Sequence, residues 1–253
     1  MGVVYELRQV HKAFGKHVVY EDMSLTIGEG ETLTVIGGSG MGKSVCLKLM
    51  LGILHADGGS VLFRGQDVGD LDHEGLRQLR RRVAMVFQGG ALFDSMTVLD
   101  NVGYALREHT KMGDQEIKDR AWECLAMVGL GADRSILQRM PASLSGGMRK
   151  RVAIARSIAI RPEVIFYDEP TTGLDPSNIR RIDEMIRKLQ RELGVTSVVV
   201  THDMPTAFSV SNRIAMLFER HFPYVGTPDE FKRSETPAVR NFVQGRISDG
   251  SQG

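Results

Sequence analysis

Four short apolar runs recur along the chain, and each is bounded by glycine-rich or polar segments. They cover residues 32–36, 83–87, 164–167 and 197–200. An apolar run of this length without polar alternation is typical of a strand that is buried on both faces of a parallel sheet. The pattern therefore predicts an α/β fold with a mostly parallel central sheet.

Segments with helical spacing of apolar residues lie between these runs. Helices are predicted at residues 45–51, 71–82, 114–128, 145–160 and 176–193, and a further one is predicted to follow Asp100-Asn101. The longest of them has the N-cap Asp175 before Pro176 and stops at Gly194. Because residues 97–142 contain no strand-like run, they are predicted to belong to a helical insertion.

The two ends of the chain carry different patterns. Residues 3–10, 17–27 and 61–63 look like strands bounded by turns, which predicts an antiparallel β subdomain. From Arg213 onward, an edge hairpin and two short helices are expected. We expect one domain over residues 1–245, with its core in residues 1–88 and 160–226 and a helical subdomain at about residues 89–159. Residues 227–253 are expected to be a C-terminal extension whose tail frays from residue 247.

Composition mainly excludes classes of protein. Charged residues make up 25% and apolar residues 42% of the chain, which is an ordinary globular balance. The net charge of +1 argues against a nucleic-acid partner, and Arg80-Arg81-Arg82 and Arg149-Lys150-Arg151 are interpreted as solvated helix faces. No secretory signal is visible, and no apolar run approaches the ~20 residues that span a bilayer, so another chain would have to hold this one at a membrane.

The first apolar run leads into a glycine-rich loop. It reads Gly37-Gly38-Ser39-Gly40-Met41-Gly42-Lys43-Ser44, which matches the P-loop pattern G-x-x-x-x-G-K-S between a strand and a helix. Glycines let backbone N–H groups approach phosphate oxygens, and the helix N-terminus adds positive potential. Lys43 is predicted to reach the β- and γ-phosphates of a nucleotide, and Ser44 is predicted to ligate Mg²⁺.

The other three apolar runs also end in polar groups. Gln88 follows the second run, Asp168-Glu169 follows the third, and His202 lies just past the fourth. Because the carboxyl ends of parallel strands share one edge of a sheet, all of these groups are expected to converge on the nucleotide. Asp168, Ser44 and Gln88 are the predicted Mg²⁺ ligands. Glu169 is predicted to accept a proton from the attacking water, and His202 to contact the γ-phosphate or orient that water.

A second glycine-bearing helix start follows Leu144. Ser145 is a plausible N-cap there, and Gly146 and Gly147 allow close approach to an anion. One nucleotide does not need two such phosphate cradles from one chain. The segment therefore indicates either a second copy of the chain or an ordinary helix cap.

Together these motifs resemble the ATPase subunit of ABC transporters. Their order along the chain matches that family: Walker A at Gly37 to Ser44, the Q-loop at Gln88, the signature at Leu144 to Gly147, Walker B at Tyr167 to Glu169, the D-loop at Leu174-Asp175 and the H-loop at His202. The resemblance covers about residues 3–226 and implies an ABC-type P-loop NTPase fold with a RecA-like core, ATP and Mg²⁺ as cofactors, and ATP hydrolysis. It further implies that Phe14 stacks on adenine, that Val45 and Asp175 belong to the nucleotide site, and that Ser145-Gly146-Gly147 caps ATP held by a second copy.

Two positions depart from the family pattern. Met148 stands where the signature commonly has glutamine, and Val45 stands where the P-loop commonly has a second hydroxyl. Loss of that hydroxyl removes one possible phosphate hydrogen bond, worth about 1 kcal/mol net. Neither departure removes a group to which catalysis is assigned.

Residues 88–102, together with residues 106–110, Val45 and Met148, resemble the Mce/Mla type of these ATPases, which move phospholipids and other lipids across the bacterial envelope. The resemblance implies a peripheral location at the cytoplasmic face of the bacterial inner membrane. The implied partners are a multi-span permease, an Mce-domain lipid-binding subunit and a STAS-domain regulator. Four apolar residues near Gln88 are expected either to grip a permease helix or to pack the core of the insertion: Leu92, Phe93, Met96 and Val98.

Three other functions compete with the lipid transporter. An ABC importer for a small polar solute would share every catalytic motif. A soluble ABC-type ATPase that acts on nucleic acid or ribosomes usually brings paired cassettes, a coiled-coil insertion or a basic surface, none of which is visible here. A P-loop kinase or GTPase would leave the signature segment, Gln88 and His202 without a role.

Overall fold

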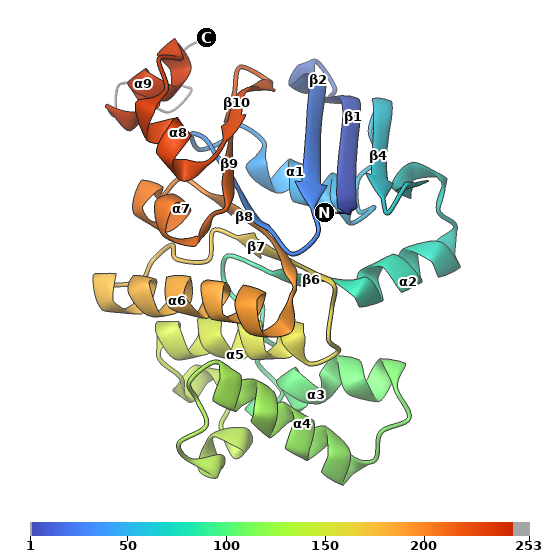
Figure 1. The fold of residues 1–253 in the computed structure, drawn as a ribbon. Helices are drawn as coiled ribbons and strands as arrows, with labels where there is room; N and C mark the ends of the chain where they lie inside the picture. The colour runs from blue at the N-terminus through green and yellow to red at the C-terminus, as the bar shows by residue number, and fades with distance from the viewer. Residues whose placement is uncertain (1, 245–253) are drawn as a thin grey trace.

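A six-stranded sheet forms the centre of the structure, a computed structural model that describes residues 2–244 (Figure 1). The strand order is β10-β9-β3-β8-β7-β6, and all neighbours pair in parallel except β10 with β9. The strands are β3 (Thr32–Ile36), β6 (Val83–Val86), β7 (Val164–Asp168), β8 (Thr196–Thr201), β9 (Arg213–Phe218) and β10 (His221–Gly226). The predicted mostly parallel sheet is confirmed.

The register of this sheet brings the ends of the predicted runs to one edge. Val35 of β3 pairs with Val200 of β8, and Val200 pairs in turn with Asp168 of β7. Tyr167 pairs with Val86 of β6. The residues that follow these positions therefore all leave the sheet at the same edge, which is where doubly covered parallel sheets bind ligands.

Both faces of the central sheet are covered. Along β7, Ile165 and Tyr167 pack in one apolar cluster with α5 (Gly146–Ile158) and α6 (Pro176–Leu193), and Phe166 packs in another with α1 (Lys43–Met50). Successive side chains of a strand point to opposite faces, so both faces of a covered strand must be apolar. The shorter helices α2 (His73–Arg82) and α7 (Met204–Val210) complete the core. Cys46 and Cys124 are both buried and unpaired.

A second sheet, antiparallel and ordered β2-β1-β4-β5, packs over α1. Its strands are β1 (Val3–Phe14), β2 (His17–Gly28), β4 (Gly58–Phe63) and β5 (Gln66–Asp67), followed by the short 3-10 helix η1 (Val68–Asp70). The Tyr5 ring lies 4.9 Å from Phe63 in its own sheet and 5.7 Å from Phe166 in the central sheet, between ring centroids. This aromatic contact joins the two sheets. The antiparallel region matches the prediction, although β1 runs four residues further than expected.

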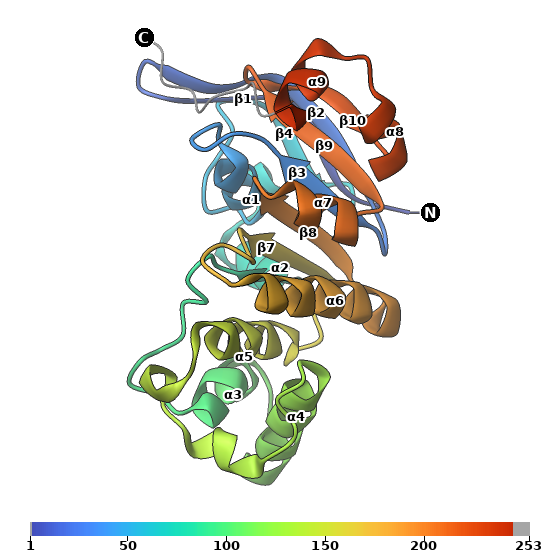
Figure 2. The same ribbon diagram turned by 90° about the vertical axis from the view of Figure 1, so that its left-hand side faces the viewer.

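The segment between β6 and β7 contains only helices. It includes α3 (Val98–His109), α4 (Asp114–Met127), η2 (Arg134–Gln138), η3 (Pro141–Ser143) and α5, which lie together below the sheet in Figure 2. The expected helix start after Asp100-Asn101 is wrong, because Thr97 is the N-cap and accepts a hydrogen bond from the Asp100 N–H at 3.1 Å. Asn101 lies inside α3 and is fully buried, where its amide bonds the backbone of Phe93 and Met96.

The chain closes with the predicted hairpin and two short helices, α8 (Pro228–Arg233) and α9 (Pro237–Val243). Phe231 and Val239 of these helices are buried against Ile214 and Met216 of β9. The frayed tail expected from residue 247 lies outside the described residues. Among the helices of residues 2–244, none combines the length and the apolar character needed to cross a membrane.

Candidate nucleotide-binding site

The P-loop connects β3 to α1 and leaves no room for side chains at two of its glycines. A Cβ on Gly37 would lie 2.6 Å from the carbonyl oxygen of Leu217, and one on Gly42 would lie 2.4 Å from a Val19 methyl group. Gly40 and Gly42 also have φ values of 76° and 99°, which L-residues with side chains rarely adopt. Tyr20 donates its hydroxyl to the Gly42 carbonyl and fixes the end of the loop. The backbone is thus shaped for close approach of an anion.

The two polar residues that follow the P-loop glycines point into the sheet edge. Lys43 is 7% exposed, and its Nζ donates to the carbonyl oxygens of Gly37 and Gly38 at 2.9 Å each. Ser44 Oγ donates to Asp168 Oδ1 at 2.8 Å, although 124 positions separate the two residues. Val45, in contrast, packs its side chain partly against the apolar core beneath the loop.

Glu169 lies at the centre of a cluster of polar groups just past β7. Its carboxylate lies 2.9 Å from His202 Nδ1, accepts hydrogen bonds from the hydroxyls of Thr172 and Thr201 at 3.2 and 3.3 Å, and lies 3.6 Å from Lys43 Nζ. The side chain is 13% exposed. The structure therefore brings Lys43, Ser44, Asp168, Glu169 and His202 together, as the sequence predicts.

Gln88 and Phe14 lie at the periphery. Gln88 follows β6 and is exposed, and no hydrogen bond within residues 2–244 ties its amide to Asp168 or Glu169. Phe14 ends β1 with 46% of its surface exposed, and Lys12 Nζ lies 5.3 Å from its ring centroid. The exposed Phe14 ring is available for stacking on an adenine base. The roles of Gln88 as a metal ligand and of Phe14 in stacking stay predictions.

The signature segment begins α5. Ser145 is the N-cap and accepts a hydrogen bond from the Met148 N–H at 3.3 Å, and both Ser145 and Gly146 are exposed. A Cβ on Gly147 would lie 2.7 Å from Asn178 Oδ1, so α5 and α6 approach closely at their N-termini. Nothing in residues 2–244 ties Ser145 or Gly146 to the P-loop by a hydrogen bond or ion pair.

Asp175 caps α6 beside this segment. Its carboxylate accepts hydrogen bonds from the Ser177 hydroxyl and the Asn178 side-chain amide, and from both backbone N–H groups. These hydrogen bonds, first the one from Ser177, hold the pKa of Asp175 well below its usual range. The predicted N-cap is confirmed, whereas a contact with nucleotide stays a prediction.

Lys150 was not expected to take part in the site. Its interpretation as part of a solvated helix face is wrong, because the side chain is 7% exposed and its Nζ donates to the Glu169 carbonyl oxygen at 3.3 Å. Burial lowers the pKa of Lys150, and the nearby Glu169 charge opposes this shift. Helical spacing from the buried Gly147 and Ile154 would have placed Lys150 on the inner face of α5.

Comparison with known proteins agrees with this geometry. The family described as "ABC transporter" matches residues 20–172. The phospholipid transport ATP-binding protein MlaF of Escherichia coli is 37% identical, with 97% of this chain and 90% of MlaF aligned. The probable ribonucleotide transport ATP-binding protein mkl of Mycobacterium tuberculosis is 39% identical, with 97% of this chain and 68% of mkl aligned.

A solved structure shares both the fold and the sequence pattern. The dimeric ATP-binding cassette MJ0796, bound to ADP and Pi, superimposes with a TM-score of 0.80 at 33% identity, over 88% of this chain and 98% of that one. The fold class is therefore the ABC-type P-loop NTPase fold. With a P-loop, a carboxylate pair and a matching family, this chain belongs to the ABC transporter family as an ATP-binding and ATP-hydrolysing subunit.

Proposed function

We propose that the chain is the motor subunit of an envelope transporter that moves phospholipid or a related lipid. The observation that carries this proposal is the likeness to MlaF, a phospholipid transport protein, which extends over nearly the full length of both chains. The same proposal places the subunit at the cytoplasmic face of the bacterial inner membrane, bound to a multi-span permease. An Mce-domain lipid-binding subunit and a STAS-domain regulator are proposed as further partners.

We propose Mg²⁺ as the metal at the sheet edge. Ser44 Oγ and Asp168 Oδ1 are hard oxygen donors 2.8 Å apart beside the phosphate loop, which is the donor chemistry that Mg²⁺ prefers. Among residues 2–244, no group of three or more His, Cys, Asp or Glu side chains could hold a metal. The ion would therefore depend on the Ser44 hydroxyl and on phosphate oxygens, with Gln88 as a further candidate ligand. When bound, it would neutralise charge that develops on the phosphates.

We assign Glu169 as the general base for the attacking water. His202 and the hydroxyls of Thr172 and Thr201 surround the carboxylate and fix its orientation. Lys43 faces the Glu169 carboxylate at 3.6 Å and would bind the β- and γ-phosphates when ATP fills the loop. When the Lys43 ammonium group moves from Glu169 to the phosphates, it would release the Glu169 carboxylate from this ion pair. The carboxylate would then be available as the base.

Removal of one predicted metal ligand is expected to raise the Mg²⁺ requirement. Ser44→Ala should shift the Mg²⁺ concentration for half-maximal hydrolysis upward by about tenfold, because one oxygen ligand and the anchor of Asp168 are lost. Titration of ATPase rate against Mg²⁺ measures this shift. Ser95→Ala, at an exposed serine without a hydrogen bond in residues 2–244, is the control. An unchanged Mg²⁺ midpoint in Ser44→Ala would contradict the assignment.

We propose that two copies form an ATP sandwich. Ser145 and Gly146 are exposed at a helix N-terminus, and within residues 2–244 no hydrogen bond or ion pair joins them to the P-loop, which supports a role toward the ATP of a second copy. The related cassette MJ0796 is dimeric. Phe14 would stack on the adenine, and Gly38, Ser39, Met41 and Val45 would line the phosphates from the P-loop side.

The permease is proposed to dock beside the Q-loop. A hollow of about 420 Å³ lies between the central sheet and α3, lined by the exposed rings of Phe87, Phe93 and Tyr104 and by Arg156. Phe93 lies 5.0 Å from Tyr104 between ring centroids, and the Arg156 guanidinium lies 5.7 Å from the Phe93 ring. Val98 follows the second of the two alternatives for its cluster, because it is fully buried in the core of the helical segment. Phe93 is therefore the residue of that cluster best placed for contact with a partner.

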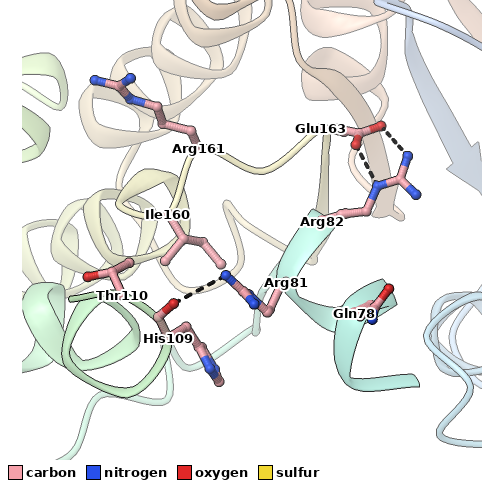
Figure 3. A pocket seen from close by; sticks show the side chains of 8 residues that line it. All are labelled: Gln78, Arg81, Arg82, His109, Thr110, Ile160, Arg161 and Glu163. Carbon is pink, nitrogen blue, oxygen red and sulfur yellow. Dashed lines mark hydrogen bonds and ion pairs between the residues drawn. The ribbon is translucent and has the colours of Figure 1, made fainter. Parts of the chain in front are cut away.

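A second, more basic hollow of about 390 Å³ adjoins the first, and Ile160 lines both hollows. Figure 3 shows Arg81 reaching the His109 carbonyl oxygen, Arg82 paired with Glu163, and Arg161 pointing away from both. The three guanidinium groups outnumber the single carboxylate of this hollow. A permease segment with an apolar face and an acidic end would complement the two hollows together.

Coupling to the permease gives a separate expectation. Phe93→Asp should lower the ATPase rate of the assembled transporter about tenfold while the isolated subunit hydrolyses ATP at its parent rate, because a buried carboxylate would weaken docking. The complex should be purified from its native operon, assayed for ATPase and extracted with organic solvent. Met112→Asp, at an exposed apolar residue after α3, is the matched control. Equal rates in the Phe93→Asp complex and its parent would contradict this docking site.

The second candidate is an importer for a small polar solute. The likeness to mkl, named for probable ribonucleotide transport, specifically favours it. Solvent extraction of the purified complex distinguishes the two functions. Bound phospholipid supports the lipid cargo, whereas a soluble solute-binding protein as partner, without lipid in the complex, would support the polar solute.

A further inference from the structure

Lys150 is a buried cation whose position the ATPase motifs do not explain. It lies on α5, and its Nζ donates to the carbonyl oxygen of Glu169 at 3.3 Å. Burial of an ammonium group is unfavourable unless hydrogen bonds or charges compensate it. The Glu169 carbonyl, together with the negative charge of the Glu169 side chain, supplies that compensation.

The Glu169 backbone is held in an unusual conformation. Its φ is +47°, in the left-handed region that residues with side chains rarely occupy. Three hydrogen bonds hold the backbone of this residue: the Glu169 N–H donates to the Val200 carbonyl at 2.9 Å, and the Glu169 carbonyl accepts from the Thr172 N–H and from Lys150 Nζ at 3.3 Å each. The direction of the carboxylate follows from this backbone, so the contact with Lys150 helps to aim the base.

The same helix carries the signature segment at its N-terminus. Lys150 lies only three positions after Gly147, which is less than one helical turn. Gly147 is pressed against Asn178 of α6, so the start of α5 cannot shift without moving its neighbours. A displacement of the signature would therefore reach the Glu169 peptide through Lys150.

We propose that Lys150 is a positioning residue that couples the two ATP sites of the dimer. In this role, ATP of the second copy binds Ser145 and Gly146, and the resulting position of α5 fixes the Glu169 backbone through the Lys150 hydrogen bond. Each chain then hydrolyses its own ATP only when its signature segment is occupied. The inference rests on the proposed ATP-sandwich dimer and adds a residue to it.

Steady-state hydrolysis by the full chain tests this coupling. Lys150→Met keeps the apolar stem and removes the donor, and should lower kcat about tenfold with the KM for ATP nearly unchanged. The Hill coefficient for ATP should fall to about 1 because the link between the sites is lost. Lys150→Gln, which retains an N–H donor, should recover much of both values. Lys188→Met, at a partly exposed lysine of α6, is the matched control and should behave like the parent.

Kinetics and sedimentation together separate this inference from the dimer on which it rests. Parent values of kcat and of the Hill coefficient in folded Lys150→Met would overturn the coupling role, as would a Lys150→Gln variant no better than Lys150→Met. Thermal unfolding shows whether each variant is folded, and Lys150→Ala replaces Lys150→Met if the latter is not. Sedimentation of Glu169→Gln with ATP tests the dimer independently: a monomer under these conditions would overturn both proposals, whereas a dimer of Glu169→Gln together with parent-like kinetics of Lys150→Met would overturn only this one.

Discussion

Glu169→Gln is expected to keep ATP binding and to lower kcat by about 10²–10⁴-fold, the range typical of a lost general base. The amide has nearly the same shape and can still accept hydrogen bonds from Thr172 and Thr201, so the local structure should persist. It cannot take a proton from water. Lys43→Ala should instead weaken both binding and turnover, because Lys43 is the cation assigned to the β- and γ-phosphates.

Two measurements on purified protein distinguish these outcomes. Fluorescent-nucleotide titration gives the affinity for ATP, and phosphate release gives kcat. Glu184→Gln makes the same chemical change at an exposed position of α6 and should match the parent in both. Turnover of Glu169→Gln at the parent rate would show that another group is the base.

Ser145→Arg is expected to abolish the ATP-dependent dimer, with dimer affinity reduced by about a hundredfold or more, because a long side chain would occupy the place proposed for the partner's γ-phosphate. The change also removes an N-cap, which costs about 1 kcal/mol of helix stability. Ser145→Asp separates the two effects. Aspartate retains a capping oxygen but places a negative charge opposite the phosphate, so it should also prevent dimerisation while α5 stays capped.

Sedimentation in the Glu169→Gln background, with and without ATP, measures this effect. That background keeps ATP intact during the run. Ser95→Arg introduces the same bulk and charge at an exposed site outside the signature segment and should leave the dimer unchanged. An ATP-dependent dimer that forms equally well with Ser145→Arg would disprove the proposed geometry.

Much of the fold could be predicted because its signals are local. Four of the six central strands (β3, β6, β7 and β8) are short apolar runs with a functional group at or within two residues of their ends, so the strand type and the edge of the sheet could both be predicted from neighbouring residues. The P-loop glycines and the caps at Ser145 and Asp175 are also local features. The meeting of Ser44 with Asp168 followed from parallel topology and is confirmed at 2.8 Å.

Helix boundaries in the insertion were less predictable, because a cap is decided by geometry as well as by residue type. Thr97, Asp100 and Asn101 are all acceptable caps, and the sequence gives no reason to choose among them. The buried amide of Asn101 decides the matter, since it bonds the backbone of Phe93 and Met96 and must lie inside the helix. Val98 is also inside α3, and it is buried because α3 packs its apolar face against α4 and α5.

The amino-acid sequence by itself determined the fold class and the identity of the residues at the catalytic edge, because strand patterns, glycines and caps depend on neighbours in the chain. Only the tertiary structure decided which partners surround Glu169 and that Lys150 is buried beneath it. Within its charged trio Lys150 looks solvated, and only the packing of α5 against the end of β7 removes it from water. Burial of a charged side chain depends on contacts between segments that are distant in sequence, and local patterns do not contain that information.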